Sequence, residues 1–207
     1  MKKLILILFI LTSCAHNRYE PQTYAQMVKK IDYSKVYIRG PLDSTSMNKF
    51  YKDIQYMEEN TKPNQEITIF INSTGGFVTV SYKMYEIVKD LTKTRKVNTV
   101  VLKDCMSGCI PILQAGTKRI MKKDSVLMLH KPSITLEIPV TEDGIPAIFQ
   151  DYIKYHQYRL KLDQKFNNLC VERLSDDNKK KVLKEMKGDY FVKPKKALEL
   201  GLIDLID

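Results

Sequence analysis

The chain has 207 residues, of which 43% are hydrophobic and 28% are charged, and its formal net charge is +10. This composition is typical of one globular domain with appendages and excludes an intrinsically disordered chain. Eight glycines and eight prolines exclude a collagen-like or proline-rich protein, and four cysteines are too few for a disulfide scaffold of this size.

The N-terminal segment has the pattern of a bacterial export signal. Two lysines follow Met1, and residues 4–11 then form an unbroken apolar run. This run is shorter than the roughly 20 apolar residues that span a membrane, and it fits the hydrophobic region of a signal peptide. It ends in Leu-Thr-Ser-Cys14, which resembles the lipobox whose cysteine receives a lipid; the alternative is a plain secretion signal. The expected organisation is a signal peptide over residues 1–13, a lipidated Cys14 with a tether over residues 14–34, and one domain over residues 35–207.

Apolar runs and helical periodicities alternate along the rest of the chain. Gly40-Pro41 and residues 73–76 are expected to end the first two strands. Ser44, Thr45 and Ser175 are candidate helix caps. The predicted strands cover residues 36–41, 67–72, 97–102 and 126–130, with a short last strand after Gly201. The predicted helices cover residues 47–57, 80–91, a short stretch from about 107, 146–170 and 175–187.

The alternation of strands and helices predicts an α/β fold. Strand–helix–strand order is the signature of crossover units, and therefore of a parallel sheet. Strands that are apolar throughout are expected where helices cover the sheet. The sequence has no internal repeat and no sign of a second domain. The fold class is therefore α/β, with a mostly parallel sheet covered by helices.

Three predicted strand ends carry residues suited to acyl-transfer chemistry. Ligands bind open parallel sheets beyond the carboxyl ends of the strands. Residues 72–76 (Asn-Ser-Thr-Gly-Gly) follow one strand, and paired glycines let backbone N–H groups approach a ligand closely. Ser107 follows the next strand at a strand–turn–helix junction, in the positive field of a helix N-terminus. His130 ends a third strand, so the topology places an imidazole near this serine.

These residue types match the needs of a nucleophilic serine. A hydroxyl needs a base such as His130 to take its proton, and the histidine needs an acceptor that fixes its tautomer. The developing oxyanion needs two N–H donors, which Gly76 and Gly108 are placed to supply. Taken singly, Ser107 is a helix cap, His130 a structural histidine and the glycines a turn; their coincidence favours a catalytic site. The residues alone do not choose the carboxylate, and His156 is given no catalytic role.

From about Val36 onward the chain resembles the ClpP peptidases and, more loosely, the wider ClpP/crotonase superfamily. The resemblance rests on four blocks: residues 69–76, Ser107-Gly108 with Ala115-Gly116, residues 128–132, and residues 189–191 with 197–204. It implies a fold of repeated β-β-α units, Ser107 as nucleophile and His130 as general base. It also implies that Asp189 orients the histidine, that the backbone N–H groups of Gly76 and Gly108 bind the oxyanion, and that the protein needs no cofactor or metal. The role of Asp189 comes from the resemblance alone.

The chain departs from the family pattern at several positions. Thr74 stands where the family usually has proline, and Gly108 stands where it usually has methionine. A segment that helps the family bind peptide and assemble rings is replaced by residues 133–139 (SITLEIP). Cys105 and Cys109 bracket Ser107, and with Cys170 they are either buried hydrophobes or partners in a disulfide whose connectivity the sequence leaves open.

We therefore expect an ATP-independent serine endopeptidase that cleaves peptides or unfolded segments through an acyl-enzyme. The expected partners are a peptide substrate, further copies of the chain and a membrane reached through the lipid; neither nucleic acid nor an ATP-dependent chaperone is expected. The first alternative is an inactive ClpP-like binding or scaffold lipoprotein. The second is a crotonase-type enzyme acting on acyl thioesters, whose substrates are not expected outside the cell.

The expected location is the bacterial cell envelope, outside the cytoplasm. Ala15 follows Cys14, and no aspartate stands there. In a two-membrane bacterium this pattern predicts an outer-membrane anchor that faces the periplasm. In a one-membrane bacterium the protein would lie on the outer face of the cytoplasmic membrane. Stable anchoring needs more than one acyl chain.

Overall fold

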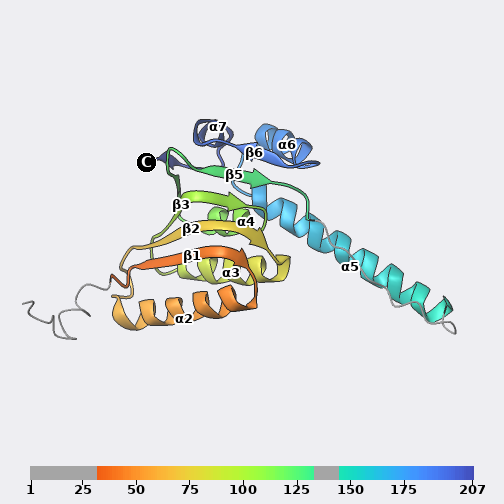
Figure 1. The fold of residues 1–207 in the computed structure, drawn as a ribbon, viewed down its shortest axis with the longest axis horizontal. Helices are drawn as coiled ribbons and strands as arrows, with labels where there is room; N and C mark the ends of the chain where they lie inside the picture. The colour runs from red at the N-terminus through yellow and green to blue at the C-terminus, as the bar shows by residue number, and fades with distance from the viewer. Residues whose placement is uncertain (1–31, 133–144) are drawn as a thin grey trace, which may run out of the picture. The chain divides into compact units, whose positions relative to one another are not determined.

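The computed structural model describes residues 32–132 and 145–207 (Figure 1). Its contacts divide the chain into residues 1–32 and residues 33–207. The predicted signal peptide, Cys14 and residues 133–139 lie outside the described residues. Among the described helices, none is long and apolar enough to cross a membrane.

The domain alternates strands and helices along most of its length, which confirms the α/β fold class. The strands are β1 (Lys35–Leu42), β2 (Ile67–Gly76), β3 (Val97–Met106), β4 (Lys118–Met121), β5 (Val126–Leu129), β6 (Tyr190–Val192) and β7 (Leu205–Ile206). The helices are α2 (Ser44–Asn60), α3 (Val78–Leu91), α4 (Cys109–Ala115), α5 (Ile145–Val171), α6 (Asp176–Glu185) and α7 (Pro194–Leu200).

The strands form one mostly parallel, 7-stranded sheet. Strands β1, β2, β3, β4 and β7 pair in that order, each parallel to its neighbour. Strand β3 changes partner along its length, because residues 98–101 pair with β4 and residues 104–106 pair with β5. On the far side of β5, β6 adds an antiparallel strand. The C-terminal end of β3 therefore lies beside β5, which brings the ends of the two strands together.

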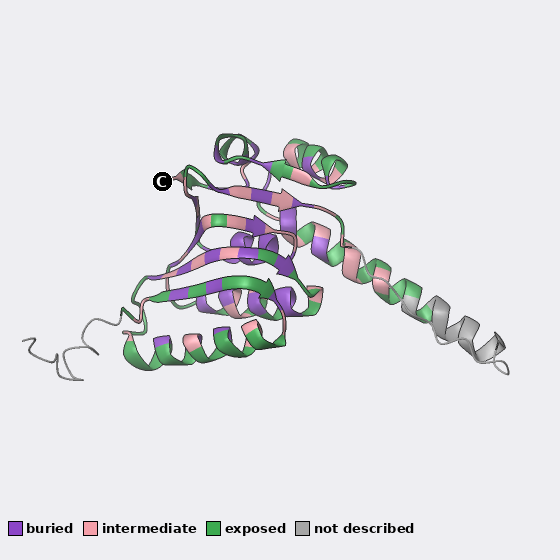
Figure 2. Ribbon diagram, in the orientation of Figure 1, coloured by how far each residue is buried: buried purple, intermediate pink, exposed green. Residues whose placement is uncertain are grey.

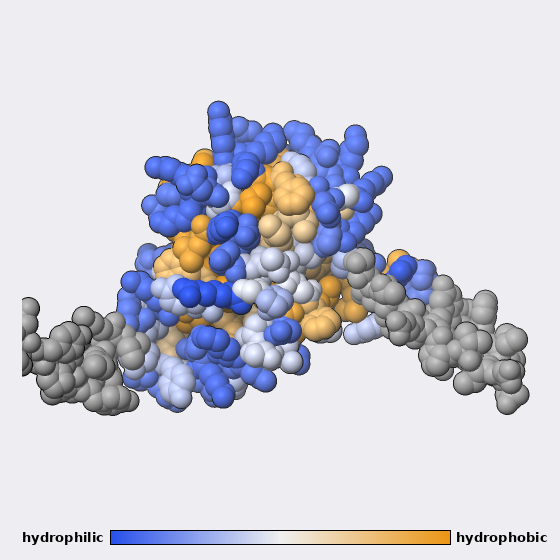
Figure 3. All heavy atoms as spheres, viewed as in Figure 1, coloured by the Kyte–Doolittle hydropathy of each residue, from blue (hydrophilic) through white to orange (hydrophobic). Residues whose placement is uncertain are grey.

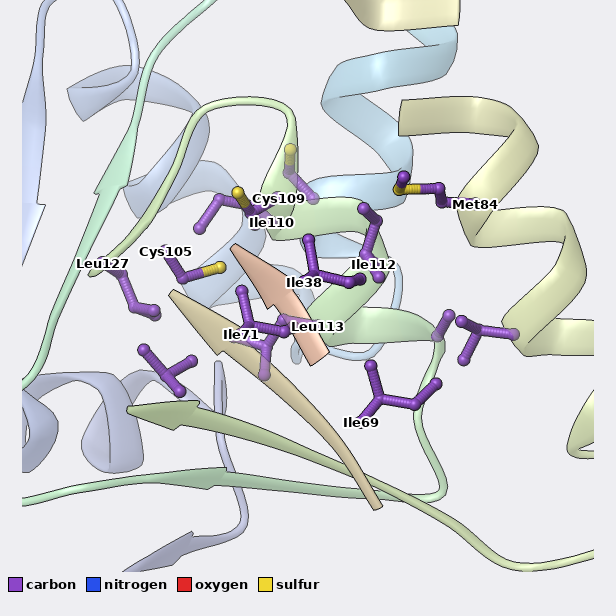
Figure 4. Packing of buried hydrophobic residues seen from close by; sticks show 14 of the residues in the cluster. Ile38, Ile69, Ile71, Met84, Cys105, Cys109, Ile110, Ile112, Leu113 and Leu127 are labelled. Atoms are coloured by element: carbon purple, nitrogen blue, oxygen red, sulfur yellow. The ribbon is translucent and has the colours of Figure 1, made fainter. Parts of the chain in front are cut away.

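The core lies between the sheet and the helices behind it. Figure 2 shows buried residues concentrated in the central strands and in α4. Ile69 and Ile71 of β2 and Ile112 and Leu113 of α4 have no exposed surface, and Figure 4 shows them within one packed cluster. Each buried aliphatic side chain of this size contributes about 1.5–3 kcal/mol through removal from water. This packing fixes the position of α4 against the sheet.

The far end of α4 is tied to the C-terminal region by a buried polar network. The Gln114 side chain donates to the carbonyl of Leu202 at 2.9 Å. Arg119, only 4% exposed, donates to Gln114 Oε1 at 2.6 Å and forms an ion pair with Asp204 at 2.6 Å. It also donates to the Gly201 carbonyl at 2.8 Å. The network satisfies a buried guanidinium and joins α4 to residues 201–204.

Several predicted boundaries were wrong, for reasons that lie in tertiary pairing. Gly40-Pro41 does not end β1; the register shifts between Arg39 and Pro41, and the strand continues to Leu42. Strand β2 continues to Gly76, because Pro41 pairs with Gly75 and Leu42 with Gly76.

Other differences concern a helix cap and two short strands. Asp43 caps α2, in place of Ser44 or Thr45, since its carboxylate accepts from the Ser46 N–H at 2.8 Å. Ser175 caps α6 as predicted. Strands β4 and β6 were not predicted, because each is too short to show a periodicity.

Candidate active site

Ser107 lies at a sharp turn between β3 and α4, at the sheet edge where the sequence predicted it. Its φ of 51° is the only positive value among the described non-glycine residues. Such a conformation costs an ordinary residue on the order of 1–2 kcal/mol, so neighbouring contacts must hold it. The Ser107 N–H donates to the Met128 carbonyl at 2.7 Å, and the Ser107 carbonyl accepts from the Ile110 N–H at 2.9 Å. The turn is therefore fixed from both β5 and α4.

Two further contacts hold the turn from β2 and α3. Ser81, which is fully buried, donates its hydroxyl to the Gly108 carbonyl at 2.6 Å. Gly75 packs directly beneath the turn: a Cβ there would lie 2.4 Å from the Met106 oxygen and 2.9 Å from Ser107 Cβ. Only glycine leaves room for this approach, and its φ of 82° favours glycine as well.

His130 and Asp189 complete a chain of polar contacts that begins at Ser107. The His130 Nε2 lies 2.7 Å from the Ser107 Oγ. On its other side, the His130 Nδ1 lies 3.2 Å from the Asp189 Oδ1. The imidazole is 29% exposed and the carboxylate 62% exposed, so the three groups meet at the protein surface. The structure thus brings together all three residues that the sequence analysis named for a triad.

Strand pairing explains how Asp189 reaches His130. Strand β6 runs antiparallel to β5, and Leu129 pairs with Tyr190. The residue after Leu129 therefore faces the residue before Tyr190, which places Asp189 opposite His130.

The two predicted oxyanion donors lie beside each other. A Cβ built on Gly108 would be 3.4 Å from the Gly76 nitrogen, so the two backbones are in close contact next to Ser107. The Ser107 carbonyl points into α4, where it accepts from Ile110. Because a trans peptide points its N–H opposite to its carbonyl, the Gly108 N–H points away from the helix. A Cβ on Gly76 would lie 2.3 Å from the Leu42 oxygen, so glycine is required there too.

Cys105, Cys109 and Cys170 are free, fully buried thiols, and no disulfide joins them. The Cys109 thiol donates to the Ser73 carbonyl at 3.3 Å. Burial raises the pKa of Cys105 and of Cys170 well above the ordinary value for a thiol. Figure 4 shows Cys105 and Cys109 among the hydrophobic side chains of the core. The arrangement matches the reading of these residues as buried hydrophobes, and it leaves Ser107 as the accessible nucleophile.

A comparison with known families agrees with this geometry. The family model of the Clp proteases matches residues 17–207. The chain belongs to the Clp protease family. Members of this family are serine peptidases that cleave peptides and form oligomers. The resemblance seen in the sequence is therefore confirmed, and the match begins before residue 35, where the domain was expected to start.

The structure also identifies residues that sequence reasoning missed. Ser81 was not singled out, because nothing in its own helix signals a bond to Gly108, 27 positions away. Gly75 was noted only as one of two flexible glycines, and its close approach to Ser107 depends on the pairing of β2 with β3. His156, which was given no catalytic role, is an exposed residue of α5. Among the described residues, no group of three His, Cys, Asp or Glu side chains could hold a metal ion.

Proposed function

We propose that this Clp protease is an ATP-independent serine endopeptidase that cleaves peptides or unfolded segments through an acyl-enzyme on Ser107. The observation that carries the proposal is the continuous contact from Ser107 Oγ to His130 Nε2 at 2.7 Å and from His130 Nδ1 to Asp189 at 3.2 Å. The order nucleophile, base, orienting carboxylate is the one that acyl transfer requires.

The roles follow from the atoms in contact. Ser107 donates its hydroxyl proton to His130 Nε2 as its oxygen attacks the carbonyl carbon of the scissile peptide bond. Asp189 accepts from the Nδ1–H and so favours the tautomer that leaves Nε2 free to act as a base. The protonated His130 then gives its proton to the leaving amine, and a water molecule hydrolyses the acyl-enzyme by the same route in reverse.

The backbone N–H groups of Gly76 and Gly108 stabilise the negative charge that develops on the substrate oxygen. The Gly108 N–H points away from α4, and the Gly76 backbone lies beside it. Because the donor at position 108 is a backbone N–H, glycine serves as well there as the methionine that the family usually has. Ser81 fixes the Gly108 carbonyl, so the donor is oriented before substrate arrives, which is the condition for effective transition-state stabilisation.

Exposed aromatic side chains beside the site support unfolded segments as substrates. Phe77, which follows Gly76 directly, is 66% exposed, and Phe191 of β6 is 59% exposed. On the face seen in Figure 3, hydrophobic residues gather across the middle, between hydrophilic residues over α6 and α7 and over α2. Apolar surface of this kind binds partners that expose apolar side chains, as unfolded chains do.

The location of the protein is also part of the proposal. The apolar run at residues 4–11 and the lipobox ending at Cys14 support a lipid-anchored protein of the cell envelope. Expression in a diderm host with a radiolabelled fatty acid tests this: labelled protein is expected in the outer-membrane fraction, and Cys14→Ser should carry no label. Label that persists in Cys14→Ser would refute lipidation at this residue.

A fluorophosphonate probe tests the chemistry. We expect the full chain, purified in detergent, to be labelled on Ser107, and labelling to be lost in Ser107→Ala and in His130→Ala. Asp189→Asn should slow labelling by orders of magnitude, because the histidine loses its orienting acceptor. Mutation of the buried Cys105 to Ala should leave Ser107 labelling in place. Folded wild-type protein that takes no label would refute the peptidase and favour the inactive scaffold.

A further inference from the structure

The solvent side of α6 and of the turn after it carries a cluster of lysines. Residues 179–187 contain five lysines and one glutamate, which gives this short stretch a formal charge of +4. The helix packs inward through Val182 and Met186, neither of which has exposed surface. Figure 3 shows hydrophilic residues covering α6 on the outside. Four of the five lysines are fully exposed, and we call them the lysine face: Lys180, Lys181, Lys184 and Lys187.

The stability of α6 does not account for the lysine face. Within the described residues these four side chains form no ion pair, whereas the neighbouring Lys179 pairs with Asp176 at 3.5 Å. The helix dipole favours a cation in the last turn, such as Lys184, but not one in the middle of the helix. Lysines four positions apart, such as Lys180 and Lys184, repel each other. The cluster therefore has an unfavourable self-energy that a negatively charged partner would relieve.

The lysine face lies beside the catalytic histidine. The Lys131 N–H donates to the Met186 carbonyl at 2.9 Å, and His130 precedes Lys131 as Lys187 follows Met186. The Cα atoms of His130 and Lys187 are therefore no more than about 15 Å apart. Lys187 is also two positions before Asp189, which contacts the imidazole. The Debye length is about 10 Å at 0.1 M salt, so the field of the lysines reaches the site and depends on salt.

We propose that the lysine face selects acidic peptide segments as substrates. The inference rests on the proposed peptidase function, for which it names the substrate class. Segments rich in aspartate and glutamate are attracted toward Ser107, and segments rich in lysine and arginine are repelled. The strand end on the other side of Ser107 does not oppose this field, because residues 72–78 carry no charged side chain. The formal net charge of +10 acts in the same direction.

An anionic lipid surface is the other large partner that exposed lysines suit. The position of the lysine face favours a substrate. His130 and Asp189 are 29% and 62% exposed, so the site opens at the surface next to these lysines. Headgroups bound to the lysine face would lie against that opening and hinder the entry of a peptide, whereas an acidic peptide bound there is already beside Ser107.

Two fluorophosphonates of equal length, one ending in a carboxylate and one in a quaternary ammonium, test the preference. The measurement is the second-order rate constant for labelling of Ser107 in the full chain, purified in neutral detergent. We expect the anionic probe to react about tenfold faster at about 0.01 M salt, and the ratio to approach one at about 1 M. The double variant Lys184→Glu/Lys187→Glu should reverse the preference at low salt. If it does not fold by circular dichroism, Lys180→Glu/Lys181→Glu should lower the ratio in the same direction.

The matched control is Lys52→Glu/Lys62→Glu, which changes the net charge by the same amount. Both lysines are exposed; Lys52 lies on α2 and Lys62 follows that helix, which packs against β1 at the other end of the sheet from β6 (Figure 1). The control should keep the wild-type ratio.

Equal rates for the two probes in the wild type at low salt would overturn the acidic preference and leave the peptidase intact. Equal rates together with binding to phosphatidylglycerol vesicles that the Lys184→Glu/Lys187→Glu variant loses would assign the lysine face to the membrane instead. A preference that falls as far in the control as in that variant would show that net charge alone is responsible, and would also overturn the proposal. Folded wild-type protein that neither probe labels would refute the peptidase, and the substrate preference with it.

Discussion

Removal of one buried hydroxyl, in Ser81→Ala, should both destabilise the domain and slow the reaction of Ser107. Ser81 has no exposed surface, and its bond to the Gly108 carbonyl is 2.6 Å long. The carbonyl of Gly108, the N-cap of α4, still accepts the first bond of that helix in the alanine variant, so the loss is that of one buried hydrogen bond, about 0.5–1.5 kcal/mol. In a domain of this size each kcal/mol lowers Tm by about 2–4 °C, so the expected loss is about 1–6 °C.

The effect on Ser107 follows from the strained turn. The φ of 51° at Ser107 persists only while its neighbours hold it, and Ser81 fixes the next peptide unit. Once this bond is absent, Ser107 and the Gly108 N–H are no longer fixed relative to His130. Displacements of about 1 Å can reduce rates about 100-fold, so we expect fluorophosphonate labelling to slow at least tenfold at a temperature where the variant is fully folded.

Ser125→Ala is the matched control. Ser125 is also fully buried, and its hydroxyl donates to the Lys122 carbonyl at 2.6 Å, outside the turn at Ser107. This variant should lose a similar amount of stability by differential scanning calorimetry and label at the wild-type rate. The reasoning is refuted if Ser81→Ala labels as fast as the wild type, or if Ser125→Ala slows labelling as much.

Three further predictions concern a glycine, an ion pair and the thiols. Gly75→Ala should destabilise the domain more than Gly40→Ala, by thermal unfolding, because both glycines have positive φ but only a Cβ at Gly75 meets other atoms. Burial alone would raise the pKa of Asp204, but the hydrogen bonds and charge of Arg119 lower it below the usual value. The resulting stability is present above the unfolded pKa of about 3.9 and is lost as pH falls through the folded pKa. Asp204→Asn should therefore lower Tm at pH 7 and flatten the decline in Tm below about pH 4; an unchanged acid decline would contradict this. A thiol reagent such as DTNB should modify the three buried cysteines, Cys105, Cys109 and Cys170, only after denaturation, as read by peptide mapping. Modification of any of them in the folded protein would contradict their burial.

The order of the main elements could be predicted because it depends on local patterns. Apolar runs marked β1, β2, β3 and β5, helical spacing marked α2, α3 and α5, and the Ser175 cap marked the start of α6. Strand ends depend on partners that are distant in sequence. β3 continues past Leu102 because Cys105 pairs with both Ser73 and Leu127, and no local pattern contains that information. The same is true of β6, whose Tyr190–Val192 forms a strand only because β5 is beside it.

The same distinction between local patterns and tertiary contacts decides which residues of the candidate site could be predicted. Ser107 and His130 could be placed together from the sequence, because the topology of a parallel sheet brings the ends of neighbouring strands to one edge. Asp189 could be named only through the family resemblance, since it reaches His130 through the unpredicted β6. The role of Ser81 could not be predicted from the sequence, because it consists of one tertiary hydrogen bond.

The network around Arg119 bears on when the site can form during synthesis. Asp204 and its partner Arg119 are 85 positions apart, and Gln114 of α4 is anchored to Leu202. A chain that emerges from the ribosome up to Ser107 therefore has neither these anchors nor the Asp189 carboxylate. Ser107 is therefore synthesised early, whereas Asp189, Leu202 and Asp204, which complete and support the site, are synthesised late. A nascent chain therefore carries Ser107 without a complete triad until its C-terminal region has been made.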